Sequence, residues 1–432
     1  MKIGAVNLAD PDVFVGGVPY DYFAFLRQHA PVTWVPRAGT DGFWAVTRHA
    51  DIVAIEKTPE VFSSRTNLLP LPIPEFTLQR DIDHNLVLTD PPRHAFLRRI
   101  IMSAFTPKAV AQLNERIKVL TAAIIDEVIE KGACDWVDVA AYVPIEVVAH
   151  ILDVPEEVRA QLFTWANATL GSSDPQVAAL LDPRTAAEQM FAYASELGRQ
   201  RRANPQDDIF SAIAAAREDG EMLSDVDLGC FFLLLATAGN ETTRTLILQG
   251  TLALIQHPEQ MRKLRADLSL LPNAIEEMLR WATPVLCFGR KALSDVELHG
   301  QLIKAGDQVV LWYCSGSRDE AVFEAPDRFD IERRNARDHL AFGAKGGIHQ
   351  CLGSMLARSE LLAMFEAIVT RLPDIRLAGP VVRLRSNFAN GIKHMPVHFS
   401  AAPASGNGPR ARLYATETVV PPPGCPMHRA VP

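Results

Sequence analysis

The stretch Phe342-Gly-Ala-Lys-Gly-Gly-Ile-His-Gln-Cys351-Leu-Gly353 decides the fold, and an Ala-, Leu- and Met-rich helical pattern follows it. A glycine-rich loop that ends in a cysteine at a helix N-terminus places the sulfur where backbone N–H groups and the helix dipole stabilise a thiolate. Glycine also lets the backbone approach a flat ligand closely. Such a thiolate can bind a soft metal or a haem iron. The alternative is a buried structural cysteine beside an ordinary glycine turn.

Two other ligands fit this stretch poorly. Zinc needs a second pair of ligands, and His349 and Cys351 have no such pair at ligand spacing. A dinucleotide loop would follow a strand and open a helix in a βαβ unit, with a later acid for the ribose, and this pattern is missing from the sequence.

The composition is that of an ordinary globular protein. The 432 residues carry a net charge of -8, with 48% hydrophobic and 22% charged residues, which argues against a nucleic-acid binder and allows a core that encloses a whole cofactor. Six cysteines are too few for a disulfide framework. We find no signal peptide at the N-terminus and expect a cytoplasmic protein. The most apolar run, Gly229 to Gly239, is too short to span a bilayer.

Apolar periodicity predicts a mainly α, α+β architecture. Helical spacing occurs near 107–131, 138–152, 184–204, 224–256 and 352–371, and short β-type runs at 33–35, 44–47, 308–313 and 396–400. No linker is visible, so we expect one catalytic domain over residues 1–400. Residues 401–432 are rich in proline and are expected to form an irregular tail, with Leu413, Tyr414, Val419 and Val420 available to dock on the body.

The stretch around Cys351 resembles the signature of the cytochrome P450 haem-thiolate monooxygenases, F-G-x-G-x-H-x-C-x-G. Gly347, His349, Cys351 and Gly353 match at the right offsets, but Phe342 stands nine residues before the cysteine and Ala344 occupies its expected place, seven residues before it. A two-residue insertion that bulges the loop is the simplest account. The resemblance implies a large helical domain, a smaller β-rich region, and haem b buried between a distal and a proximal helix, with Cys351 as the iron ligand and Gly347 beside it.

Three further segments resemble the family in the right order along the chain. Glu277-Met-Leu-Arg280 is similar to E-x-x-R, which implies a structural ion pair with Arg328 of Pro326-Asp-Arg-Phe329. Asp90-Pro-Pro-Arg-His94-Ala-Phe-Leu-Arg98 is similar to D-P-P-x-H-x-x-x-R, which implies that His94 and Arg98, with Arg290 and His349, bind the haem propionates. In isolation, the first pattern would be a solvated surface pair and the second an exposed basic helix start.

The third segment, Ala238-Gly-Asn-Glu241-Thr242-Thr243, resembles the distal motif A/G-G-x-D/E-T. Glycine beside an acid and an alcohol conflicts with local helix preference, so we expect a distorted helix turn at a functional site. The resemblance implies that Ala238 borders the haem, that Thr242 hydrogen-bonds bound dioxygen and that Glu241 relays protons. The alternative is a surface acid and threonine. With Gly42–Asp51 and Ser386–Val397, the resemblance covers roughly residues 15–400.

The implied activity is insertion of one oxygen atom from O2 into a lipophilic molecule such as a terpenoid, fatty acid or steroid. Electrons would come from a separate ferredoxin or flavodoxin and its reductase, docking on a monomer beside Arg93, Arg98, Arg99, Lys108 and Lys118, unless these are merely solvated helix charges. The loop 68–76 is expected to form a wall of the substrate pocket, which family position lines with Leu234, Thr237, Ala238, Val285, Leu286, Phe388 and Ala389. Open alternatives are peroxide-driven oxidation, C–C coupling, and a non-catalytic haem-binding partner module.

Overall fold

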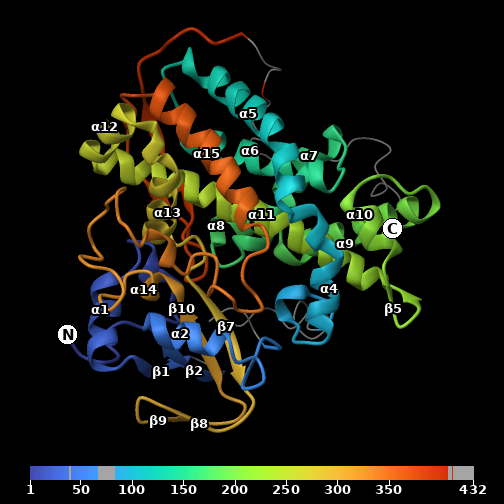
Figure 1. Cartoon of the computed structure of the whole chain (residues 1–432), viewed down its shortest axis with the longest axis vertical. Coiled ribbons are helices and arrows are strands. Elements are labelled where there is room, and N and C mark those ends of the chain that lie inside the picture. The colour runs from blue at the N-terminus through green and yellow to red at the C-terminus, as the bar shows by residue number, and fades with distance from the viewer. Residues whose placement is uncertain (38–39, 67–82, 407–410, 412–432) are drawn as a thin grey trace.

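A computed structural model describes residues 1–37, 40–66, 83–406 and 411 of the chain. Its larger part is helical, and the long helix α11 (Asp225–Gln256) crosses the middle of the molecule (Figure 1). Ser224 starts α11 with a capping box, because its hydroxyl accepts from the backbone N–H of Asp227 while the Asp227 carboxylate accepts from the backbone N–H of Ser224.

The helices around α11 bury a single large apolar core. In this part of the chain the structure places α4 (Arg93–Ile101), α5 (Pro107–Ile129), α6 (Trp136–Ile151), α7 (Glu156–Leu170), α8 (Pro175–Ala178), α9 (Pro183–Ala203), α10 (Ile209–Ala215), α12 (Pro258–Ala266), α13 (Leu271–Ala282) and α15 (Ser354–Arg371). Helices α6 and α9 pack most extensively on α11. The apolar run expected to be a buried core helix lies inside α11.

A five-stranded sheet forms the second, smaller part, drawn below the helices in Figure 1. Its order is β1 (Val32–Arg37), β2 (Thr40–Val46), β10 (Gln308–Trp312), β7 (Cys287–Ala292) and β3 (Phe62–Ser63), with β10 parallel to β2 and the other neighbours antiparallel. Helices α1 (Tyr20–His29), α2 (His49–Glu56) and α14 (Tyr313–Gly316) accompany it. Alternate sheet residues feed two separate apolar clusters, one with Phe23 and Trp312 and one with Ile52 and Leu311.

The remaining strands are short and lie in small sheets. They are β4 (Ala133–Asp135), β5 (Arg217–Glu218), β6 (Glu221–Met222), β8 (Val296–Leu298), β9 (Gln301–Ile303), β11 (Arg376–Leu377), β12 (Val382–Arg383), β13 (Ile392–His394) and β14 (Pro396–His398). One of these sheets pairs β14 with both β11 and β4, which joins the strand at 396–398 to the chain just before α6.

The predicted helices and strands are confirmed. Helices α5, α6, α9, α11 and α15 match the five periodic segments to within about two residues at each end, and β1, β2, β10 and β14 match the four β-type runs. Of the proline-rich tail, the structure describes 401–406 and 411. Ser400 and Ser405 bind Asp374 and Asp126 of the body through backbone N–H and hydroxyl groups, and the four tail residues expected to dock lie outside the described ranges.

The ion pair between Glu277 and Arg280 is present, but the prediction that Arg328 joins it is wrong. Glu277 and Arg280 are completely buried, and Arg280 Nε lies 2.7 Å from Glu277 Oε2. The second guanidinium on Glu277 belongs to Arg333, whose Nε is 3.1 Å from the same oxygen. Arg328 points outward toward Asp330 with 67% of its side chain exposed. The chain turns so that the backbone carbonyl of Arg328 faces Arg280 and accepts from it at 3.2 Å.

No helix within the described ranges is long and apolar enough to cross a membrane.

Candidate active site

The loop before Cys351 accommodates its two extra residues, and Phe342 stays hydrogen-bonded to the cysteine. The backbone N–H of Cys351 donates to Phe342 O at 2.9 Å, and the intervening residues form a turn in which Gly347 N–H donates to Ala344 O at 2.9 Å. Gly343 and Gly346 take φ values of 76° and 81°, a region that favours glycine. The Phe342 ring lies 4.7 Å beneath the guanidinium carbon of Arg358. The insertion therefore bulges away while its two ends remain hydrogen-bonded.

Glu56, at the C-terminal end of α2, anchors this widened loop. Its buried carboxylate accepts hydrogen bonds from the backbone N–H of Ala344, from Arg290 Nη2 at 3.0 Å and from the Tyr313 hydroxyl at 2.5 Å. A Cβ on Gly347 would stand 3.3 Å from the Glu56 carbonyl oxygen, so a larger residue would crowd this contact. The sequence analysis missed Glu56, because nothing in the pattern of α2 distinguishes it from a surface acid.

Cys351 is a free cysteine directly before α15 and is exposed. Surrounding protein is nevertheless the main cause that raises the pKa of its thiol. The backbone N–H groups of Gly353 and Ser354 and the side chain of Arg98 oppose the rise in pKa, as expected for a sulfur at the first turn of α15.

The four side chains expected to bind propionates converge beside this sulfur. The rings of His94 and His349 lie 4.4 Å apart, and Arg98 Nη2 donates to Gln350 O at 2.8 Å. Burial, followed by Arg98, lowers the pKa of His94 to about 4. Burial and then Arg290, His94 and Arg98 hold the pKa of His349 well below its usual range. Burial and the neighbouring arginines thus both disfavour the charged form of each imidazole.

This cluster fits a ligand with two carboxylates. The Nε2 atoms of His94 and His349 are buried and have no hydrogen-bond partner among the described residues. An unpaired buried polar atom costs about 1–3 kcal/mol, and two guanidinium groups lie beside them. Of these cations, Arg290 already holds Glu56, while no carboxylate within the described ranges pairs with Arg98. Propionate oxygens would satisfy these nitrogens and the remaining positive charge.

One face of α11 is less buried than the rest of the helix around Thr242. Ala238 is exposed and Leu234 and Thr242 are half-buried in a helix that is otherwise mostly buried. The Thr242 hydroxyl donates to Ala238 O at 2.7 Å. The expected distortion of this turn is wrong: α11 is helical without interruption, because the hydroxyl adds a bond to a carbonyl that keeps its place in the helix.

Glu241 lies on another face of α11 and is engaged away from Thr242. Its buried carboxylate forms an ion pair with Arg244 and accepts from the Thr245 hydroxyl at 3.3 Å. Arg244 in turn donates to Asn167 Oδ1 of α7 at 2.9 Å. The neighbouring Asn240, which the sequence analysis passed over, is fully buried, and neither of its amide atoms has a partner in the part of the chain that the structure describes.

The residues expected to line a substrate pocket differ in their burial. Val285 and Phe388 are half-buried, and Val285 forms a β-bridge with the buried Ala389. The expectation for Leu286 is wrong: it is fully buried in the apolar cluster on the opposite side of the sheet. Successive residues of an extended chain point to opposite faces, so Val285 and Leu286 cannot share one pocket. Phe288, which the sequence did not single out, lies nearby on β7, with its ring 5.5 Å from that of Phe388.

Thr237 was expected to be the one hydrogen-bond donor in the pocket. The structure shows it buried, with its hydroxyl donating to Leu233 O at 2.7 Å inside α11. The role of Thr237 as a donor to a ligand therefore stays a prediction, because its hydroxyl bonds within the helix and its side chain is buried. The expected wall at 68–76 lies outside the described residues.

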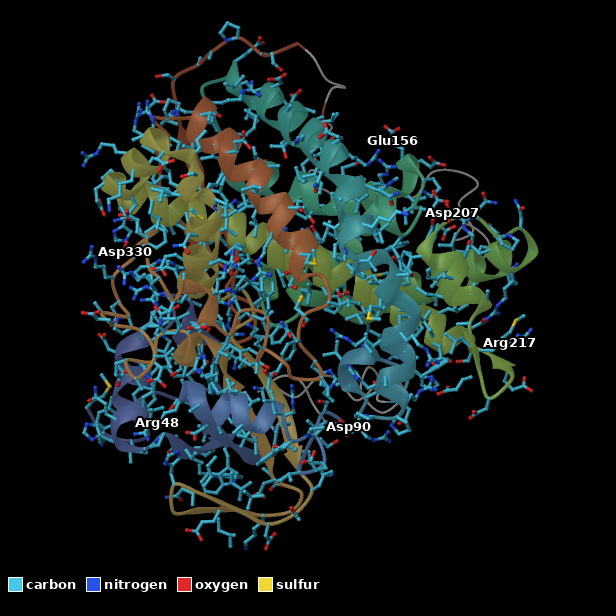
Figure 2. All side chains as sticks on the ribbon, in the orientation of Figure 1. Arg48, Asp90, Glu156, Asp207, Arg217 and Asp330 are labelled. Carbon is cyan, nitrogen blue, oxygen red and sulfur yellow. The ribbon has the colours of Figure 1, made fainter. Side chains whose placement is uncertain are left out.

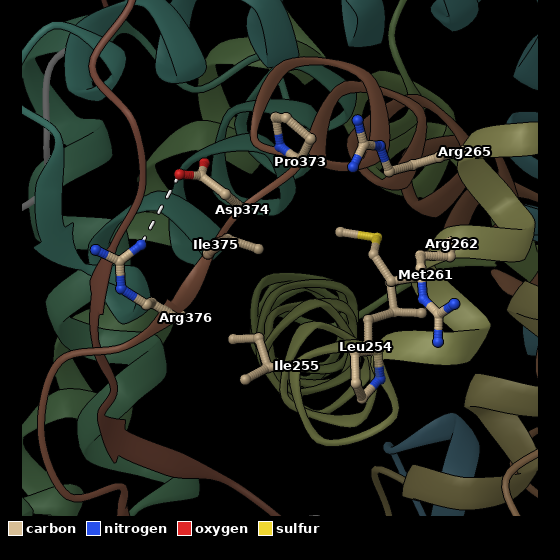
Figure 3. A pocket seen from close by; sticks show the side chains of 10 residues that line it. Leu254, Ile255, Met261, Arg262, Arg265, Pro373, Asp374, Ile375 and Arg376 are labelled. Atoms are coloured by element: carbon tan, nitrogen blue, oxygen red, sulfur yellow. Dashed lines mark ion pairs between the residues drawn. The ribbon is translucent and has the colours of Figure 1, made fainter.

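A groove of about 300 Å³ lies at the C-terminal end of α11 and is a separate feature (Figure 3). Leu254, Ile255 and Met261 contribute apolar lining, and Arg376, on its edge, pairs with Asp374 at 3.8 Å. Leu254 is twelve residues beyond Thr242, which corresponds to roughly 18 Å along a helix. The groove is thus remote from the distal turn.

Comparison with known proteins identifies the class. The model of the family described as Cytochrome P450 matches residues 182–372. A steroid C26-monooxygenase of Rhodococcus jostii is 38% identical over 92% of this chain and 85% of its own length. A methyl-branched lipid omega-hydroxylase of Mycobacterium tuberculosis is 37% identical over 88% of this chain and 90% of its own length. The solved structure of a Mycobacterium marinum cytochrome P450 in complex with pseudoionone is 38% identical, with a TM-score of 0.85 over 92% of this chain and 99% of that chain.

The chain belongs to the cytochrome P450 family. It is a haem-thiolate monooxygenase that uses haem b and O2 and acts on lipophilic small molecules. The predicted family, fold class, cofactor and class of reaction are thereby confirmed.

Proposed function

We propose that Cys351 ligates the iron of haem b and that His94, Arg98, His349 and Arg290 hold its propionates. The observation that carries this proposal is the pair of buried, unpartnered imidazole nitrogens beside two guanidinium groups at the Cys351 loop. The haem, when bound, supplies the activation of O2 and the transfer of one oxygen atom to the substrate. The protein around it positions the substrate, excludes water and delivers protons.

On the distal side, Thr242 holds the proton nearest the reacting oxygen and Glu241 replenishes it. The Thr242 hydroxyl, now donating to Ala238 O, is the hydrogen-bond donor nearest this face of α11. The Glu241 carboxylate is engaged by Arg244, so its ion pair must loosen before it can serve Thr242. The strength of the ion pair with Arg244 therefore determines what fraction of the time the Glu241 carboxylate is unpaired. The complete acid–alcohol pair favours O2-driven over peroxide-driven chemistry.

The substrate is a lipid whose aliphatic chain enters the pocket end-on, with oxidation near the chain terminus. Relatives named for steroid C26 and methyl-branched lipid omega oxidation support this class. The side chains expected to line the pocket at Leu234, Ala238, Val285 and Phe388 are apolar, and the Thr237 hydroxyl donates to Leu233 O within α11. Burial of apolar surface, at about 25 cal/mol per Å², is then the main source of affinity.

The electron donor is a small acidic ferredoxin or flavodoxin that docks over the Cys351 loop. Of the basic residues expected to form its site, Arg93 is neutralised by Glu218 and Asp227, Arg98 turns inward to Gln350, and Lys118 pairs with Glu115. Arg99 and Lys108 remain exposed on α4 and α5, and Lys57 and Lys345 stand exposed beside the loop. These four exposed cations form the proposed docking site for the electron donor. Binding of the donor to this site should weaken strongly as the salt concentration rises.

Haem esterification tests the propionate assignment. Apoprotein should bind haem b at least tenfold more tightly than haem dimethyl ester, whose blocked carboxylates accept weaker hydrogen bonds. Arg98→Ala should reduce this preference, whereas Arg99→Ala, the exposed neighbour on α4, should retain it. Equal affinity of wild type for both haems would refute the assignment.

Turnover with a ferredoxin and its reductase on a sterol with a branched side chain tests how the substrate enters. The product should be the terminal alcohol, and exclusive oxidation of the rings would refute end-on entry.

A further inference from the structure

The aromatic ring of Phe342 contacts two side chains that share one carboxylate. The guanidinium carbon of Arg358, on α15, lies 4.7 Å from the centre of this ring. The ring of His339, in the chain just before the loop, has its centre 5.6 Å from that of Phe342. Both contacts come from residues outside the stretch 342–351, so they can hold the aromatic end of the loop from its surroundings.

Glu276, on α13, binds both of these side chains. Arg358 Nε lies 2.7 Å from Glu276 Oε1 and Arg358 Nη2 lies 2.9 Å from Oε2, so the guanidinium is held by two parallel hydrogen bonds. His339 Nδ1 accepts from the backbone N–H of Ala341 at 3.1 Å, which leaves the proton of the neutral ring on Nε2, 3.3 Å from Glu276 Oε2. The side chains of Glu276 and His339 are only 3% and 2% exposed, so their contact is shielded from water.

The same arginine reaches the chain on the other side of the cysteine. Arg358 Nη1 donates to Ser354 O at 3.2 Å, in the first turn of α15. Phe342, whose ring Arg358 contacts, accepts from the Cys351 N–H through its carbonyl oxygen at 2.9 Å. One guanidinium thus contacts both the residue at which the loop begins and the helical turn that follows its end.

The insertion makes the position of this ring depend on contacts made across the chain. In the family signature the phenylalanine stands seven residues before the cysteine, and here Ala344 occupies that place while Phe342 stands nine residues before it. Glu56 holds the backbone of Ala344. The Phe342 ring is contacted by Arg358 and His339 instead. The widened loop therefore has two separate supports, one on its backbone and one on its aromatic end.

We propose that Arg358 is a positioning residue for Cys351. It holds the Phe342 ring against α15, which keeps the Phe342 carbonyl in place to accept from the Cys351 N–H and so determines how the sulfur is presented to the iron. Glu276 orients Arg358 for this task. The inference rests on the proposed role of Cys351 as the iron ligand. Because the groups around a metal ligand tune the metal, a change at Arg358 should alter the reduction potential of the bound haem.

Hydrogen exchange of the haem-bound protein, followed by mass spectrometry with residue-level fragmentation, tests the positioning directly. The Cys351 amide should exchange about tenfold faster in Arg358→Ala than in wild type, because its acceptor is held less firmly. Arg371→Ala removes an arginine that pairs with Asp126 at the end of the same helix, and it should leave this rate unchanged. A Cys351 amide that exchanges at the wild-type rate in Arg358→Ala would overturn the proposal.

The reduction potential of the bound haem separates positioning from a simple effect of charge. Loss of a cation near the iron lowers the potential and loss of an anion raises it, so a charge effect alone would shift Arg358→Ala and Glu276→Gln in opposite directions. Positioning predicts shifts in the same direction, because both variants break the same pair of hydrogen bonds. Shifts in opposite directions would refute the positioning role.

Arg358→Lys gives the same test with the charge retained. An ammonium cannot form the two parallel bonds to Glu276, so both the amide exchange rate and the potential should stay changed from wild type. Wild-type values of both in Arg358→Lys would show that only the charge matters and would overturn the proposal. Arg217→Ala removes one exposed arginine on β5, at the edge of the molecule in Figure 2, and controls for the change in net charge.

Two outcomes separate this inference from the function on which it rests. If wild type lacks a thiolate-type carbon-monoxide band, the assignment of Cys351 as the ligand fails and the positioning role fails with it. If wild type has this band and Arg358→Ala keeps both the wild-type potential and the wild-type amide exchange, Cys351 remains the ligand and only the role of Arg358 fails.

Discussion

The loop around Cys351 and the turn of α11 around Thr242 differ in how their buried polar groups are hydrogen-bonded. In the loop, Glu56 receives three hydrogen bonds and the Cys351 backbone closes the turn onto Phe342. In the turn of α11, Asn240 is buried without partners among the described residues, and Glu241 is engaged by its ion pair with Arg244. Under the proposed roles, the iron-binding side is the more fully hydrogen-bonded of the two, and we expect the proton-delivery side to rearrange more readily.

Substitution of Glu277 should have the largest effect, because it supports the iron-binding side. Glu277→Ala would leave Arg280 and Arg333 buried without their carboxylate and should cost about 3–5 kcal/mol, enough to prevent stable haem incorporation. Urea unfolding measures this cost. Arg328→Ala, at the exposed position first expected to complete the ion pair, should change the free energy of unfolding by less than about 0.5 kcal/mol. A cost as large as that of Glu277→Ala would contradict the assignment of Arg333.

Substitutions on the proton-delivery side should change how much product is formed per electron pair consumed. Thr242→Ala removes the donor nearest the reacting oxygen and should lower the product formed per electron pair by about tenfold, with hydrogen peroxide released instead. Substrate affinity should be unchanged, because among the described residues the hydroxyl bonds to Ala238 O alone. Parallel assays of product and peroxide measure this. Unaltered coupling would show that Thr242 has no part in proton delivery.

Glu56 tests whether the widened loop depends on its anchor. Glu56→Gln weakens the bonds to Ala344 N–H, Arg290 and Tyr313, and should cost about 1–3 kcal/mol with faster loss of haem. The rate of haem transfer to an acceptor protein measures this. Glu60→Gln, at an exposed site four residues on, is the control and should match wild type. Equal rates for both variants would mean that the loop holds without Glu56.

The smallest effect concerns acid stability on the iron-binding side. Burial of the Glu276 carboxyl raises its pKa, but hydrogen bonds from Arg358 and His339 outweigh this effect. Together they lower the pKa of Glu276 to about 2. A carboxyl whose pKa is depressed on folding stabilises the protein above its unfolded pKa, so this contribution is complete above about pH 4.5 and is lost as the pH falls toward about 2. Glu276→Gln should remove on the order of 1–2 kcal/mol at pH 7 and flatten this dependence. Denaturant unfolding between pH 3 and 7 measures it, and an unchanged slope would contradict the coupling.

The sequence predicted the fold and the position of the cysteine because both rest on local signals. Helical periodicity set the bounds of α5, α6, α9, α11 and α15, and the glycine-rich loop marked Cys351. Side-chain partners made across the chain were not predictable in this way. Glu56 reaches Ala344 over 288 positions, and Arg333 rather than Arg328 meets Glu277 because of a turn in the backbone.

The reduced carbon-monoxide difference spectrum tests most directly whether the widened loop presents Cys351 as a thiolate ligand. The hydrogen bond from Cys351 N–H to Phe342 O and the Glu56 anchor predict a thiolate-type Soret band in wild type. Cys351→Ala should abolish that band, and Cys134→Ala, which changes a half-buried cysteine between α5 and α6, should retain it. A wild-type spectrum of the imidazole or neutral-thiol type would contradict the account.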